Sequence, residues 1–469
     1  MKTMKYLFAG ALMLGFSAQA MAQDVQAQID AITKVVVSAN GNAATVKDQV
    51  KEYVKVNKKN AEALAGLGTA FLKAKNTGEA TKYADMAIKA NKSEAAGYLL
   101  KGDIAATNDD GGEAAMWYQT ATIQDPKDPS GYIRYARIYQ KVDALGAANM
   151  LEKLRTVDPS YPVDADIAYM YSRNGKMKMA VDYYDKVKDW SKIDTYYLSD
   201  YAVSAMLLGQ QEKSLAAAKK GLSMKPRNAG FNRMAFYNST DLKQYDEALN
   251  YADALFNRSD SLKTLPNDFK YLAYAQKGAG RTQEAIENFK KVYDMDNTQT
   301  DLLKTIAESY LETKSYDEAI EYYNKYNENS DQKRVADFEA IAHVYMEQAE
   351  IDEAIKKDFL MKADEVYAKI AVDFPNNEDY ATYRRAALHH QMNPNLKEGA
   401  AKPFYEKYAQ LLEQRTERSA AEDASLAVAY NYLAVYYIQN DKVAQAKEYA
   451  KKLAELQPDN ETAKQILAI

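Results

Sequence analysis

The chain has 469 residues, of which 47% are hydrophobic and 27% are charged, and its formal net charge is −5. This balance lacks the basic excess of general nucleic-acid binders, so no nucleic-acid partner is expected. The chain contains no cysteine, which excludes disulfides, thiolate metal sites and a cysteine nucleophile. A bacterial lipoprotein anchor, which needs a cysteine at the cleavage point, is excluded for the same reason.

Residues 1–22 predict a signal peptide. Lys2 and Lys5 precede an uncharged, mostly apolar stretch from Tyr6 to Phe16, and Ala20-Met21-Ala22 forms a small-x-small cleavage pattern. An uncleaved anchor is the alternative, but this stretch is too short to cross a bilayer as a helix. No later stretch is long and apolar enough to do so. We therefore expect export to the periplasm of a Gram-negative bacterium, or alternatively secretion, with no integral membrane segment after cleavage.

The remaining sequence repeats itself with a period near 34 residues. The phrase Tyr245-Asp246-Glu247-Ala248-Leu249 recurs as Tyr316-Asp317-Glu318-Ala319-Ile320, and Thr282-Gln283-Glu284-Ala285-Ile286 lies between them. The three alanines are spaced by 37 and 34 residues. A fixed period of this length is the mark of a repeat architecture, in which each repeat contacts only its neighbours.

Small residues recur at two positions of each repeat. The position of those alanines is Ala in ten of twelve repeats, and the position twelve residues earlier is Gly or Ala in nine of twelve. Two antiparallel helices joined by a short turn approach closely only where small side chains meet. The ten alanines predicted to pack the repeats are Ala80, Ala114, Ala148, Ala180, Ala248, Ala285, Ala319, Ala363, Ala401 and Ala446.

This pattern resembles the tetratricopeptide repeat (TPR) family, in which a repeat is a pair of helices. The resemblance implies an all-α fold, an α-solenoid wound as a right-handed superhelix of about twelve TPR-like helix pairs. Aligned on the family pattern, the repeats start near Ala27, Ala61, Ala95, Pro129, Tyr161, Thr195, Ala229, Pro266, Thr300, Val335, Asn377 and Ala427.

The repeats divide the mature chain into four parts. Residues 23–60 form a degenerate capping repeat, because Lys34 and Val46 occupy its two small positions. Residues 61–334 form a regular array, and residues 335–426 form repeats with insertions. Residues 427–469 hold a final repeat and a partial capping helix.

Extra residues distort the later repeats. About nine lie between the two helices of the Val335 repeat, around Gln348 to Phe359, and others lie near Asn393 to Glu398 and in the charged segment Glu413 to Asp423. An earlier insertion, Arg258 to Leu265, contains Asp260-Ser261-Leu262, which resembles an O-glycosylation acceptor, although a capped turn is the favoured interpretation. Insertions of this kind either contact a partner or are changes of loop length without a function.

The family resemblance also implies a concave groove lined by the first helix of each pair. Tyrosines and cations concentrate at groove positions of the middle repeats, a combination that suits an acidic peptide. The alternative is a solvated face whose tyrosines shield the next repeat. The candidate partner-binding residues are Arg137, Lys141, Tyr169, Arg173, Arg233, Tyr237, Lys270, Tyr274 and Lys277. Farther on, the groove positions become acidic.

No catalytic constellation is visible. Of the three histidines, His389 and His390 are adjacent, so on a helix they point about 100° apart and do not chelate one metal as a pair. His343 has no ligand partner in the sequence, and there is no glycine-rich phosphate loop or nucleophile elbow. We therefore expect no catalytic, cofactor-binding or metal-binding residues and no enzyme activity.

The sequence thus predicts a non-catalytic scaffold or adaptor in the bacterial periplasm. It would bind protein or peptide partners at an envelope machine for secretion, outer-membrane assembly or uptake. The alternative is a module that binds glycan or peptidoglycan through its tyrosines. The oligomeric state is left open.

Overall fold

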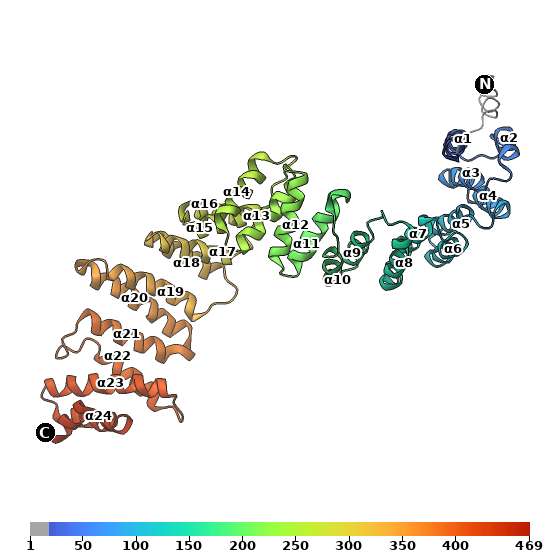
Figure 1. Cartoon of the computed structure of the whole chain (residues 1–469). Coiled ribbons are helices and arrows are strands. Elements are labelled where there is room, and N and C mark those ends of the chain that lie inside the picture. Colours follow the sequence, from blue (N-terminus) through green and yellow to red (C-terminus); the bar gives the residue numbers. More distant parts are fainter. Residues whose placement is uncertain (1–17) are drawn as a thin grey trace. The chain divides into compact units, whose positions relative to one another are not determined.

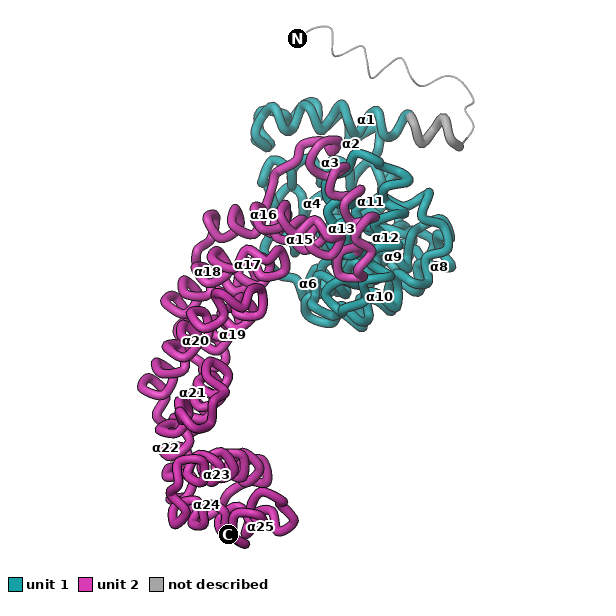
Figure 2. The backbone as a smooth tube through the Cα atoms, turned by 90° about the vertical axis from the view of Figure 1, so that its left-hand side faces the viewer, with its two compact units in different colours: residues 1–238 teal, residues 239–469 magenta. Residues whose placement is uncertain are grey.

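Helices alternate with short turns along the whole of the computed structural model, which describes residues 18–469, with side chains from Asp24 onward. Residues 1–17 of the predicted signal peptide lie outside the described part. Within that part every regular element is helical, in agreement with the predicted all-α solenoid. The chain divides into two compact units, Met1–Asn238 and Ser239–Ile469 (Figure 2).

Unit 1 contains six consecutive helix pairs and most of α13. In each pair from α3 onward, the first helix packs against the second, and the second packs against the first helix of the next pair (Figure 1). The helices are α1 (Ala18–Ser38), α2 (Lys47–Asn57), α3 (Ala61–Lys73), α4 (Thr77–Ala90), α5 (Ala96–Thr107), α6 (Gly111–Gln124), α7 (Pro129–Tyr139), α8 (Ala144–Val157), α9 (Val163–Arg173), α10 (Met177–Tyr184), α11 (Thr195–Leu207), α12 (Gln211–Met224) and α13 (Ala229–Asp241).

Unit 2 also stacks helix pairs, and its last helix, α25 (Glu461–Ala468), packs on α23 and α24. Its other helices are α14 (Tyr245–Asp253), α15 (Pro266–Gly278), α16 (Thr282–Met295), α17 (Asp301–Glu312), α18 (Tyr316–Asn329), α19 (Val335–Ala349), α20 (Glu353–Asp373), α21 (Glu378–Met392), α22 (Lys402–Glu413), α23 (Ala420–Gln439) and α24 (Val443–Leu456). A short π-helical segment, Ala254–Arg258, follows α14.

The predicted small residues lie at the helix crossings. All ten repeat-packing alanines are buried, with an exposed fraction of at most 2%. Gly68 shows why larger residues do not fit: a Cβ atom there would lie 3.1 Å from the Ala80 carbonyl oxygen and 2.4 Å from Leu100 Cδ2. The side chains beside each crossing, such as Leu100, then fill the core between successive pairs.

The turn inside a helix pair has one recurring form. In the first regular repeat, Lys75 adopts a left-handed conformation with φ of 61°, and the Asn76 amide donates to the Phe71 carbonyl at 2.9 Å. This bond closes the end of the first helix as a Schellman motif. Gly175, Gly209 and Gly280 occupy the same place in later repeats, where glycine adopts this conformation without strain.

The extra residues of the later repeats are largely helical. Those predicted between the helices of the Val335 repeat instead lengthen its second helix, α20, to 21 residues. The predicted start of the final repeat at residue 427 falls inside α23, because the charged segment before it supplies that helix's first turns from Ala420. Residues 393–401 and 414–419 form loops, and in the first of them Asn393 and Asn395 both donate to the Glu398 carboxylate.

Candidate protein-binding groove

The first helices of three successive pairs in unit 1, α7, α9 and α11, line a hollow. On α7, Pro129 follows the N-cap residue Asp128, whose carboxylate accepts a hydrogen bond from the Ser130 amide at 2.7 Å. This cap fixes the start of α7, and Arg137 follows two turns later. Lys141 lies in the turn just after α7, about one helical turn beyond Arg137.

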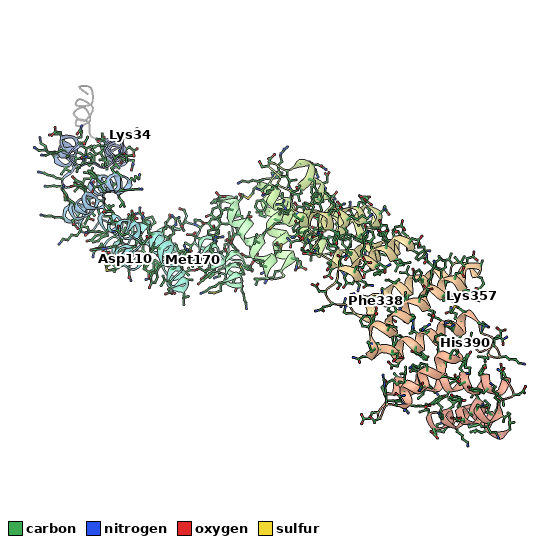
Figure 3. All side chains as sticks on the ribbon, turned by 180° about the vertical axis from the view of Figure 1, so that it is seen from behind. Lys34, Asp110, Met170, Phe338, Lys357 and His390 are labelled. Carbon is green, nitrogen blue, oxygen red and sulfur yellow. The ribbon has the colours of Figure 1, made fainter. Side chains whose placement is uncertain are left out.

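The hollow has a volume of about 470 Å³. Figure 3 labels Met170, one of its lining residues on α9. We call it the basic hollow, and its lining residues are Ala136, Arg137, Gln140, Lys141, Leu151, Asp166, Tyr169, Met170, Arg173, Asn174 and Tyr196. It therefore brings together four of the nine candidate groove residues, which lie on different repeats.

The three cations of the basic hollow are exposed. Between residues 24 and 469, no ion pair involves Arg137, Lys141 or Arg173, whereas neighbouring cations such as Arg134 and Arg155 are bound to carboxylates. Three positive charges around one hollow repel each other and attract an anion. Each guanidinium can bind a carboxylate with two parallel hydrogen bonds.

Aromatic rings form one wall of the basic hollow. Tyr169 packs edge-on against Tyr196 and Tyr197, with ring centroids 5.3 Å and 5.8 Å apart. Tyr196 is 45% exposed, so much of its ring is open to a ligand. Tyr and Arg on a shared concave surface are the residue types that carry most binding energy at protein interfaces.

A partly buried hydrogen-bond network holds that wall in place. Asp166 accepts hydrogen bonds from Tyr161 Oη at 2.6 Å and from Tyr197 Oη at 3.1 Å. Burial, reinforced by the Asp166 charge, raises the pKa of both tyrosines, so they remain protonated donors at neutral pH. The aromatic wall is therefore preorganised rather than free to collapse into the hollow.

The other five candidate groove residues lie elsewhere. Arg233 and Tyr237 are on α13 in unit 1, where the Tyr237 ring packs edge-on against Phe236 at 5.4 Å. In unit 2, Lys270 Nζ donates to Gln299 Oε1 at 3.0 Å, and Lys277 forms an ion pair with Glu312 at 3.1 Å.

Tyr274, also on α15, is 39% exposed and packs edge-on against Phe289 at 5.0 Å. Because Lys277 forms an ion pair with Glu312, the groove positions of α15 carry less unpaired positive charge than the sequence predicts. Sequence reasoning also missed seven lining residues of the basic hollow, among them Gln140, Asp166, Asn174 and Tyr196. Gln140 and Tyr196 occupy groove positions of the repeat pattern, so the same reasoning could have found them.

The histidines belong to unit 2. His389 stacks on Phe404 with ring centroids 4.2 Å apart, and its Nε2 lies 3.3 Å from Asp364 Oδ2. His390, labelled in Figure 3, packs edge-on against Tyr432 at 5.3 Å. In the described part of the chain, no group of three or more histidine or acidic side chains is arranged to hold a metal ion.

Among residues 18–469, none of the helices combines the length and the apolar character that a membrane span requires.

Comparison with known proteins points to one family. Models of the tetratricopeptide repeat match residues 66–129 in unit 1 and residues 277–341 and 427–460 in unit 2. No curated protein sequence matches the chain significantly.

Solved structures similar to this chain include the C-terminal part of a TPR repeat-containing protein from Cytophaga hutchinsonii, with 22% identity over 58% of this chain and 100% of that chain and a TM-score of 0.41. A TPR protein from Parabacteroides merdae has 16% identity over 54% of this chain and 98% of that chain, with a TM-score of 0.32. MamA from Desulfovibrio magneticus RS-1 has 18% identity over 37% of this chain and 96% of that chain, with a TM-score of 0.32.

The family matches fall in both units, and the structure stacks helix pairs whose crossings carry the small residues of the repeat pattern. This chain is therefore a tetratricopeptide repeat protein, with matched repeats in both units.

Proposed function

We propose that this protein is a non-catalytic scaffold of the bacterial periplasm, which binds an acidic segment of a protein partner in the basic hollow. TPR repeats support a protein–protein interaction scaffold in general. We extend this general function by proposing that the protein is located in the periplasm and is associated with an envelope machine. The signal pattern of residues 1–22 and the absence of cysteine support this address.

One observation carries the choice of partner chemistry. Arg137, Lys141 and Arg173 surround one hollow and form no ion pair within residues 24–469, beside the rings of Tyr169 and Tyr196. The one acidic residue that lines this hollow, Asp166, already accepts hydrogen bonds from Tyr161 and Tyr197. Aspartate or glutamate side chains of a peptide would pair with the cations, and the peptide's apolar atoms would pack on Tyr169 and Tyr196. Gln140 and Asn174 add amides that can hydrogen-bond a peptide backbone.

The test is affinity capture after cross-linking in intact cells. A tagged chain should recover a reproducible set of proteins, and the charge reversal Arg137→Glu with Arg173→Glu should remove the partner that uses the basic hollow. The matched control is Lys153→Glu with Lys178→Glu, which changes the charge equally at exposed positions on α8 and α10, the second helices of the same pairs. The control should keep every partner.

Two results would count against the proposal. If the Arg137→Glu and Arg173→Glu variant recovers the same proteins as the parent, the basic hollow is not the binding site. If the chain recovers no protein but is retained on peptidoglycan, the glycan-binding alternative is correct. The proposed periplasmic location would be tested separately, by release of the protein on osmotic shock and by sequencing of the mature N-terminus, which is expected at Gln23.

A further inference from the structure

The first helix pair of unit 1 is packed differently from those that follow. Its first helix, α1, packs mainly on α3, where Ile29 lies over Gly66 so closely that a Cβ there would be 2.6 Å from Ile29 Cγ1. The second helix, α2, buries Val50 in the core and forms two hydrogen bonds toward its C-terminal end. Tyr53 Oη donates to the Ala63 carbonyl at 3.0 Å, and Asn57 Nδ2 donates to Gln28 Oε1 at 3.0 Å.

A second hollow of about 500 Å³ lies between α2 and α4. We call it the α2–α4 hollow, and its lining residues are Ala43, Ala44, Lys47, Val50, Lys51, Val54, Phe71, Glu79, Lys82, Tyr83 and Met86. Since it lies between the second helices of two pairs, it is distinct from the basic hollow, which lies between first helices.

The interior of the α2–α4 hollow is apolar. Phe71 and Tyr83 form its floor as a stacked pair with ring centroids 5.6 Å apart. Val50 and Val54 line it from α2, and Met86 lines it from α4. A polarisable, flexible methionine beside two aromatic rings accommodates apolar side chains of several shapes.

The rim of the α2–α4 hollow on the α2 side is basic. Lys47 and Lys51 lie one turn apart, and Lys55 continues the same line along the helix. All three are exposed, and among residues 24–469 none of them forms an ion pair. Like charges four residues apart destabilise a helix slightly, and Asp48 and Glu52, three residues before Lys51 and Lys55, offset this effect within α2.

The acidic groups nearby do not remove this positive charge. Asp48 and Glu52 are on α2 but do not line the hollow, and Glu79 on α4 is already bound to Lys82 at 2.8 Å. The α2–α4 hollow therefore combines an apolar interior with two unpaired lysines at its edge.

We infer that the α2–α4 hollow docks an acidic amphipathic helix of a partner protein. One or two apolar side chains of that helix would enter between Val50, Val54 and Met86, while its carboxylates would pair with Lys47 and Lys51. A groove between two helices is a common receptor for a third helix. The concave shape favours this occupant over a membrane, because membrane-binding surfaces present apolar side chains that protrude into the bilayer.

The absence of cysteine allows a site-specific reporter of occupancy. A single Ala44→Cys substitution, at an exposed lining residue, would be labelled with an environment-sensitive fluorophore in the full chain. The probe is a helical peptide of about 14 residues, or four turns, with two leucines four residues apart and flanking glutamates. One comparison peptide replaces the glutamates with lysines, and another replaces the leucines with alanines.

The glutamate–leucine peptide should shift the fluorescence and bind about tenfold more tightly than either comparison peptide. Lys47→Glu with Lys51→Glu should remove that preference. Lys58→Glu with Lys89→Glu is the matched control, since these exposed residues lie on or next to the same helices but outside the hollow, and it should bind as the parent does. All four lysines are exposed, so folding is expected to be unaffected.

Three results would overturn the inference. The first is equal binding of all three peptides, and the second is unchanged binding by the Lys47→Glu and Lys51→Glu variant. The third is a fluorescence shift with phosphatidylglycerol vesicles but not with the peptide, which would assign the surface to a membrane. Variants of the basic hollow should leave peptide binding at this surface unchanged, so the two proposals fail independently.

Discussion

Ser214 and Asn238 are joined by a buried hydrogen bond at a helix crossing of unit 1. Asn238 Nδ2 donates to Ser214 Oγ at 2.8 Å, and Ser214 Oγ in turn donates to the Ala202 carbonyl at 2.8 Å. Ser214 occupies the position that is alanine in ten of the twelve repeats. The one serine at this position is therefore small enough for the crossing and uses its hydroxyl to link three successive helices, α11, α12 and α13.

Replacing Ser214 with alanine should destabilise the chain by about 1 kcal/mol, because the Asn238 amide loses one of its acceptors in a buried site. The side chain remains small, so the crossing itself is preserved. Urea unfolding followed by circular dichroism would measure the change. If the Ser214→Ala variant is as stable as the parent, the hydrogen bond makes no net contribution to the free energy of unfolding.

The register of the repeats can be tested at Ala285. This side chain is fully buried at the crossing of α15 and α16, so Ala285→Glu would place a charge where no partner is available. We expect a loss of about 3–5 kcal/mol, or local unfolding of this pair. Gln283→Glu introduces the same residue at an exposed position of α16 and should change stability by less than about 0.5 kcal/mol. Similar thermal unfolding of the two variants would contradict the assigned register.

The Asp364 carboxylate should make the stability of unit 2 depend on pH. It accepts two hydrogen bonds from Arg385, at 2.8 Å and 3.0 Å, and lies beside His389. Burial alone raises the pKa of Asp364, but the hydrogen bonds and charges of His389 and Arg385 outweigh it and hold the pKa below its ordinary value. A lowered pKa in the folded state stabilises the fold above the unfolded-state pKa of about 3.9.

Asp364→Asn should therefore cost about 1.5–3 kcal/mol at pH 7 and at pH 5. The difference from the parent should shrink as the pH falls below about 4 and vanish once Asp364 is protonated in the folded state. Unfolding in urea at pH 7, 5 and 3 would measure it. A difference that has already disappeared at pH 5 would contradict the role given to this carboxylate.

Tyr196 should matter for binding but not for stability. Because much of its ring is exposed, Tyr196→Ala should leave the unfolding temperature nearly unchanged while weakening capture of the acidic partner about tenfold. Tyr196→Phe keeps the ring and should retain most of the binding. If both variants bind like the parent, the aromatic wall is not part of the partner-binding surface.

The helix pairs could be predicted from the sequence because close helix packing requires small residues at fixed positions of each repeat. A crossing that tolerates only Gly, Ala or Ser repeats at a fixed position, as Gly68 and Ala80 show. The longer α20 could not be predicted, since extra residues with helix-forming side chains look the same whether they extend a helix or fill a loop.

The candidate site was predicted only in part, for a different physical reason. Groove positions identify which side chains face inward, and they found Arg137, Tyr169 and Arg173. Whether a cation there is free depends on the neighbouring repeat, however. Lys277 forms an ion pair with Glu312 of the next repeat, while Arg137 forms none within residues 24–469, and this difference arises from side-chain packing rather than from the repeat pattern.

The most direct test of the central claim is photo-cross-linking at the basic hollow in living cells. A photoreactive amino acid would replace Tyr196, which lines the hollow, and in a separate variant Ala216, which is exposed on α12 outside it. We predict that the Tyr196 position cross-links to one or a few proteins through segments rich in aspartate and glutamate, and that the Ala216 position does not. The same cross-links from both positions, or none from Tyr196, would contradict the proposed scaffold function of this hollow.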